Sequence, residues 1–211
     1  MTSPTVPTAP ALSAVVLVGS LKSSSEPSSS ELLGRQVLDA LGEHGVTGTV
    51  VRLADHDVRP GVEVDMGSGD AWPAIRRQIL DADILVLATP IWMGQPSSVT
   101  KRALERLDAE LAETDDQGRM LTYGKVAAVA VVGNEDGAHH TSAELFQALN
   151  DVGFTLAPGA VTYWVGEAMG SVDYKDLDEV PEKVATTTAT LASNTAHLAR
   201  LLRTAPYPPV G

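Results

Sequence analysis

Residues 12–19 read LSAVVLVG, and this short run indicates the fold of the chain. It is almost wholly apolar and ends at a glycine, which is typical of a strand buried on both faces of a parallel sheet. The stretch 28–44 follows, with Leu33, Val37 and Leu41 spaced as on one face of a helix. A strand followed by a helix is the repeating unit of α/β proteins.

The same alternation continues along the chain. Further strands are expected at 47–54, 83–89, 125–133 and 155–165, and further helices at 72–80, 97–113, 141–152 and 183–203. This alternation favours parallel strands with helices on both faces, so we predict a doubly wound α/β fold with five parallel strands. We expect one domain over residues 12–203, between tails at 1–11 and 204–211.

The composition is that of an acidic chain without cysteine. Its 211 residues include 15 lysines and arginines and 27 aspartates and glutamates, a formal net charge of −12. This charge disfavours nucleic acid and anionic membranes as partners. The lack of cysteine excludes disulfides and cysteine-ligated metals, and we expect no metal site. We see no signal peptide and no run that would insert into a membrane, so the expected location is the cytoplasm.

The first of three loops at strand ends suits a phosphate. Parallel α/β sheets bind ligands at the carboxyl ends of their strands, and this loop leads from Gly19 to a serine-rich helix start. Free N–H groups at a helix N-terminus attract anions, and hydroxyls and a lysine add donors. The predicted contacts are Ser20, Lys22, Ser28, Ser29 and Ser30. Ser28 and Glu31 also form a Ser-x-x-Glu capping box, so capping without a ligand is an equal alternative.

The second loop, PIWMGQP at 90–96, suits a flat ring. A tryptophan and a methionine beside a glycine are costly to expose unless something covers them. A planar heterocycle would cover them, and a glutamine could bond its edge. The expected contacts are Pro90, Ile91, Trp92, Met93, Gly94 and Gln95. Packing of Trp92 into the core or into a subunit interface is the alternative.

The third loop reads GNEDG at 133–137. Gly133 and Gly137 permit close backbone approach, and Asn134 can donate to and accept from a uracil-like edge. The acidic pair between them is expected to face outward or to cap the next helix.

Four side chains with rings lie near these loops in the sequence, and we assign none of them to ligand binding. Adjacent histidines usually point apart and a metal needs three or four ligands, so His139 and His140 are expected to be loop or cap residues. Tyr163 and Trp164 end the fifth expected strand, where strand packing is the favoured interpretation. A ligand contact of any of the four is left open, and no catalytic side chain is assigned.

An anion cradle, a ring contact and a glycine loop at one sheet edge favour a mononucleotide, and flavin mononucleotide (FMN) fits best. The chain shows neither the Gly-x-x-x-x-Gly-Lys-Ser/Thr pattern of triphosphate loops nor the Gly-x-Gly-x-x-Gly pattern of dinucleotide loops. It also lacks the Gly-x-Ser-x-Gly elbow of serine hydrolases.

Over residues 12–165 the chain resembles the flavodoxin-like NAD(P)H-dependent FMN reductases and quinone oxidoreductases. The resemblance is carried by GSLK at 19–22 with the serines at 28–30, TPIWMG at 89–94 and GNEDG at 133–137. It implies a flavodoxin-like sheet of strand order 2-1-3-4-5, bound FMN and NAD(P)H as the electron donor. Lys22 replaces the family's commoner arginine, which removes a bidentate phosphate contact.

The resemblance also implies hydride transfer from NAD(P)H through FMN to a quinone, azo, nitro or flavin acceptor. Family members commonly pair with the flavin near the interface, so a homodimer or higher homo-oligomer is expected. Trp92 and residues 114–124 are the candidates to reach that interface. The alternatives are a flavodoxin-type electron carrier without NAD(P)H turnover and a non-flavin binding module on the same fold. The physiological acceptor and the choice between NADH and NADPH stay open.

Overall fold

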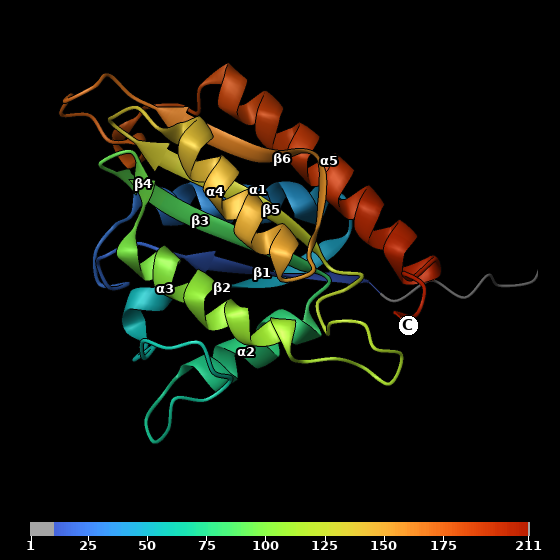
Figure 1. The fold of residues 1–211 in the computed structure, drawn as a ribbon. Coiled ribbons are helices and arrows are strands. Elements are labelled where there is room, and N and C mark those ends of the chain that lie inside the picture. Colours follow the sequence, from blue (N-terminus) through green and yellow to red (C-terminus); the bar gives the residue numbers. More distant parts are fainter. Residues whose placement is uncertain (1–10, 211) are drawn as a thin grey trace, which may run out of the picture.

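A parallel sheet lies between two layers of helices in the computed structural model, which describes residues 11–210 (Figure 1). The parallel strands are β1 (Leu12–Val18), β2 (Val46–Arg52), β3 (Ile84–Trp92), β5 (Val126–Gly133) and β6 (Thr155–Val165). They lie in the order β2-β1-β3-β5-β6. This confirms the predicted fold and the predicted order, since β4 (Gln95–Pro96) is a short strand paired with β3. The expected N-terminal tail lies, except for residue 11, outside the described residues.

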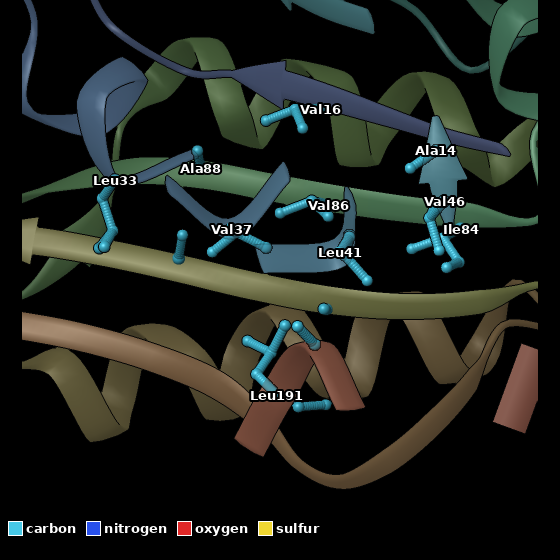
Figure 2. Close-up of a cluster of buried hydrophobic side chains, with 14 of the residues drawn as sticks. Ala14, Val16, Leu33, Val37, Leu41, Val46, Ile84, Val86, Ala88 and Leu191 are labelled. Carbon is cyan, nitrogen blue, oxygen red and sulfur yellow. The ribbon is translucent and has the colours of Figure 1, made fainter. Parts of the chain in front are cut away.

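The helices divide between the two faces of the sheet. They are α1 (Ser29–Glu43), α2 (Trp72–Asp81), α3 (Ser98–Leu107), α4 (Ala138–Asp151) and α5 (Glu182–Thr204). Side chains of α1 and α5 share one buried cluster with the sheet, and side chains of α2, α3 and α4 share the other. Figure 2 shows part of the first cluster, where Leu33 and Val37 of α1 and Leu191 of α5 gather around strand side chains.

Alternate side chains of β1 are buried in the two clusters on opposite faces of the sheet, which is why the run 12–18 is almost wholly apolar. Val16 faces α1 and α5, whereas Val15 and Leu17 face the other layer. Burying each such side chain contributes about 1.5–3 kcal/mol. Helix α1 approaches β1 closely at Gly34, where a Cβ would lie 2.9 Å from Val16 Cγ1. This close packing fixes where α1 begins relative to the strand ends.

A hairpin that the sequence did not predict extends the second loop. Strand β3 continues to Trp92 instead of ending at residue 89, and the chain turns through Met93 (φ 53°) and Gly94 (φ 74°) into β4. Two successive residues with positive φ suit a tight hairpin turn. The helix expected over 97–113 ends at Leu107 and continues as a short 3₁₀ turn.

Residues 114–124 lie at the amino end of β5, so they occupy the edge of the sheet opposite the three loops (Figure 1). The end of the chain packs here. Arg119 donates to the Tyr207 carbonyl at 2.9 Å, and Val210 N donates to the Gln117 carbonyl at 3.0 Å. None of the helices in residues 11–210 has both the length and the apolar character to cross a membrane.

Candidate functional site

A cavity of about 510 Å³ opens at the carboxyl ends of β1, β3, β5 and β6. Strand β2 lies on one side of β1 and β3 on the other, so the direction of chain progression reverses between β1 and β3. Ligands of open α/β sheets bind at such a switch point, and the volume is usual for a small-molecule site.

The three loops meet at this cavity. Its wall includes the predicted contacts Ser20, Lys22, Ser28, Ser29, Ser30, Pro90, Ile91, Trp92, Gly133 and Asn134. The structure does not bring four other predicted contacts to this wall, namely Met93, Gly94, Gln95 and Gly137. Those four lie in the β3–β4 hairpin and at the start of α4, where the hairpin packs directly on Gly137.

The start of α1 forms one end of the cavity. Ser28 is the N-cap of α1, and its Oγ accepts from Glu31 N at 3.3 Å. This serine therefore caps the helix, which is the alternative that the sequence predicted for it. Ser29 Oγ accepts from Lys175 N at 3.2 Å, which leaves its hydroxyl proton available to a ligand. The first N–H groups of a helix have no partner within the helix. This end of the cavity therefore offers several donors to an anion.

Arg52, at the end of β2, holds the first loop from beneath. Its buried guanidinium donates to the carbonyls of Lys22, Ser23 and Glu26, and it pairs with the carboxylate of Glu31. One cation thereby fixes both the loop and the first turn of α1. No pattern in the sequence marks Arg52, because only the pairing of β2 with β1 in the folded sheet brings it under the loop.

Buried hydroxyl groups join the first loop to the second. A Cβ on Gly19 would lie 1.7 Å from Thr100 Oγ1, so a larger residue cannot fit there. Ser97 Oγ donates to the Gly19 carbonyl at 2.5 Å, and Thr100 Oγ1 donates to Thr89 Oγ1 at 3.0 Å. The end of β3, the start of α3 and the first loop are thus held together.

The middle of the cavity is apolar. Ile91 is buried, while Trp92 at 54% exposure stands at the mouth, which excludes the core packing offered as an alternative for it. Trp164, at the end of β6, completes this region together with Val132. The Glu135 carboxylate also belongs to the wall and accepts from Met93 N at 2.8 Å, so it ties the hairpin to the third loop.

Asn134 has an unused acceptor. Its Nδ2 donates to Asp173 Oδ1 at 3.0 Å. In the part of the chain that the structure describes, its Oδ1 is buried and accepts no hydrogen bond. A buried acceptor without a partner costs about 1–3 kcal/mol. This oxygen packs toward Gly166, where a Cβ would lie 2.7 Å from it.

The histidines lie outside the cavity. Both are in the first turn of α4, where His139 Nε2 is 3.1 Å from the Tyr163 hydroxyl and His140 Nε2 is 2.9 Å from Gln95 Nε2. Of the four ring-bearing side chains left without a role, only Trp164 lines the cavity. Within residues 11–210 we find no cluster of three or more His, Asp or Glu that could hold a metal ion.

The donor set fits FMN. Helix donors and the Ser29 hydroxyl suit its phosphate, and the surfaces of Ile91, Trp92 and Trp164 suit its ring system. Asn134, which also lines the cavity, suits the polar edge of the ring. A phosphate, a flat apolar body and a polar ring edge thus each find complementary groups in one cavity.

Comparison with known proteins gives consistent results. A family model described as NADPH-dependent FMN reductase matches residues 12–169. An 8-demethyl-8-aminoriboflavin-5'-phosphate synthase of Streptomyces davaonensis is 31% identical over 93% of this chain and 80% of the relative. The divalent metal cation transporter MntH of Mycobacterium bovis is 37% identical over 91% of this chain, but the chain spans only 29% of that protein's length.

Solved structures agree. RosB, solved with the bound intermediate 8-demethyl-8-formylriboflavin-5'-phosphate, superposes with a TM-score of 0.84 at 31% identity, over 93% of this chain and 82% of RosB. An NADH:FMN oxidoreductase (EMOB) gives a TM-score of 0.62 at 18% identity, over 90% of this chain and 89% of that chain. A flavodoxin from the domain Archaea gives 0.57 at 9% identity, over 90% and 99%. The last two show the fold alone, which is flavodoxin-like.

Proposed function

Because the chain belongs to the NADPH-dependent FMN reductase family, we propose that it passes hydride from NAD(P)H through FMN to a small-molecule acceptor. The acceptor class is a quinone, azo, nitro or flavin compound. Membership supports FMN as the cofactor with NAD(P)H as its donor, and makes the chain a relative of flavin-related oxidoreductases. What we propose beyond family membership is that the chain turns over with NAD(P)H and that its acceptor belongs to this class.

The meeting of three complementary regions in one cavity carries this proposal. When bound, FMN supplies the redox chemistry by accepting hydride and returning electrons to an acceptor. The residues of the chain bind and orient it: Ser29 and the N–H groups of α1 hold the phosphate, and Ile91 and Trp92 hold the ring. Asn134 lies in the wall beside the polar edge of the ring. No side-chain proton transfer is required of the wall.

The mouth of the cavity suits the binding of two substrates in succession, first NAD(P)H and then the acceptor. Trp92 and Met169 line it, and both side chains are largely exposed. Apolar surface at an open rim suits a nicotinamide ring and then a flat acceptor in turn.

We also propose that the protein forms a homodimer or higher homo-oligomer in the cytoplasm, without a nucleic-acid partner. Leu21, Trp92, Met93 and Met169 expose apolar surface beside the cavity, and such patches favour association. Residues 114–124 lie at the opposite edge of the sheet, so of the two expected interface segments only Trp92 adjoins the cavity. Light scattering on the protein as it elutes from a size-exclusion column would give the mass of the assembly.

A second candidate function takes the flavin as substrate. The observation that favours it is the similarity to the synthase and to RosB, which was solved with a formylated riboflavin phosphate. The cavity of this chain would serve both functions, because each needs the flavin bound by its phosphate and its ring.

Anaerobic absorption spectroscopy tests the proposal. We expect the purified chain to bind FMN, NADPH or NADH to bleach the bound flavin, and a quinone to restore its colour. Binding without bleaching by either nucleotide would support the electron carrier, and no uptake of FMN would support the non-flavin module. Mass spectrometry of the released flavin separates the second candidate, because chemical alteration of the flavin changes its mass whereas redox cycling returns it unchanged.

A further inference from the structure

A short segment after β6 completes the cavity. Asp173, Tyr174 and Lys175 belong to its wall, whereas the family match ends at residue 169. This part of the wall is therefore a property of the chain that the family model does not describe.

Tyr174 anchors the segment against the body of the protein. Its side chain is buried, and its hydroxyl donates to Gln36 Oε1 of α1 at 2.6 Å. Its ring lies 5.6 Å from the ring of Trp164. Since burial and a hydrogen bond hold Tyr174, the residues on either side of it have fixed positions.

Lys175 is thereby placed at the start of α1. Its backbone N–H donates to Ser29 Oγ at 3.2 Å, so residue 175 touches a serine of the proposed phosphate cradle. Its ammonium pairs with Asp173 at 2.9 Å and with Asp176 at 2.7 Å. The ammonium has three donors, so it can hold a carboxylate and a further anion at once.

Only two cations line the cavity among the residues that the structure describes, Lys175 and Lys22. Lys22 is 60% exposed and pairs with Glu26 at 3.3 Å. Lys175 is 25% exposed, so water screens its charge less. A chain of net charge −12, with carboxylates in the same wall, needs a local cation to hold a dianion.

We propose that Lys175 is the cation that binds the flavin phosphate, delivered to the start of α1 by the segment 170–176. The inference rests on FMN being the ligand of the cavity. The phosphate takes the place of Asp176 beside the ammonium, because Asp173 is also held by Asn134. Asp176 is therefore a competitor of the phosphate for Lys175.

Two variants with opposite expected effects test this. Lys175→Met should weaken FMN binding about tenfold, because a charge-assisted contact to phosphate is lost. Asp176→Asn should tighten FMN binding about twofold, because a competing carboxylate is removed. Riboflavin lacks the phosphate, so its affinity should stay unchanged in both. Lys175→Arg should retain most of the FMN affinity.

Fluorescence quenching titrations with FMN and with riboflavin give the readout without turnover. Lys101→Met is the matched control, since Lys101 is exposed and pairs with Glu144 away from the cavity. Lys22→Met tests the other lysine and should weaken FMN binding less than Lys175→Met.

The outcomes separate the two proposals. Unchanged FMN affinity in Lys175→Met, or equal weakening of both flavins, would overturn the role of Lys175 while leaving FMN as the ligand. If the unaltered chain binds neither flavin, the proposed function fails and the role of Lys175 fails with it.

Discussion

Arg52→Met tests whether the first loop is shaped by the protein before a ligand binds. The guanidinium contacts three loop carbonyls and the Glu31 carboxylate, and it is shielded from solvent. Methionine retains the apolar stem but removes the charge and every donor. The first loop and the first turn of α1 would lose the group that joins them.

The expected magnitude follows from these contacts. Removing one partner of a buried ion pair costs about 3–5 kcal/mol. Two features reduce this figure: Glu31 keeps its pairing with Arg35, and Arg52 Nε is buried without a partner among the described residues. We expect the free energy of unfolding to fall by about 2–3 kcal/mol, at or below the lower end of that range because of these two features. FMN affinity should fall about tenfold or more, because the donors of the cradle lose their fixed positions.

Urea unfolding followed by circular dichroism measures the first effect, and FMN titration of the folded protein measures the second. Arg35→Met is the control, since Arg35 is exposed and pairs with the same carboxylate. It should change stability by less than about 0.5 kcal/mol. The reasoning would be refuted if Arg52→Met matched Arg35→Met in both measurements.

Three further changes have defined outcomes. Ser29→Asp puts a negative charge at the start of α1, so FMN affinity should fall about tenfold while riboflavin affinity stays unchanged; equal FMN affinity in fluorescence titrations would count against a phosphate there. Burial raises the pKa of Asp70, but hydrogen bonds from Met66 N and from Arg106, among others, outweigh it and hold the pKa at about 2, below its ordinary 3.8. The folded state therefore binds this proton less tightly than the unfolded state. Ionised Asp70 contributes about 2 kcal/mol to the free energy of unfolding, which is fully present above about pH 4 and is lost as the pH falls toward 2. Asp70→Asn should remove that portion of the acid dependence in urea unfolding from pH 2 to 6, and an unaltered pH profile would contradict the assignment. Trp92→Ala should weaken FMN and riboflavin binding alike, about fivefold, since stacking does not involve the phosphate; a loss confined to FMN in parallel titrations would argue against a ring contact.

The order of strands and helices could be predicted because burial on both faces leaves a plain signal. Apolar runs such as 12–18 alternate with stretches that have helical spacing, and few folds satisfy that alternation. The β3–β4 hairpin could not be predicted in the same way. Its second strand is only two residues long, and the turn before it holds Met93 at a positive φ, which local propensity does not indicate for methionine.

The cradle and the ring wall were accessible from sequence because they directly follow strand ends. For Trp164 the sequence favours strand packing, because an aromatic residue in a strand has no spacing that marks a ligand contact. Lys175 and Arg52 had no local signal at all. Both act on the first loop from segments that only the folded sheet brings beside it.

A crystal structure of the chain grown with FMN tests the central claim most directly. The account predicts the phosphate at the start of α1, within hydrogen-bond distance of Ser29, and the ring beside Ile91 and Trp92 with its imide edge at Asn134. A flavin bound elsewhere, or an empty cavity at saturating FMN, would contradict it.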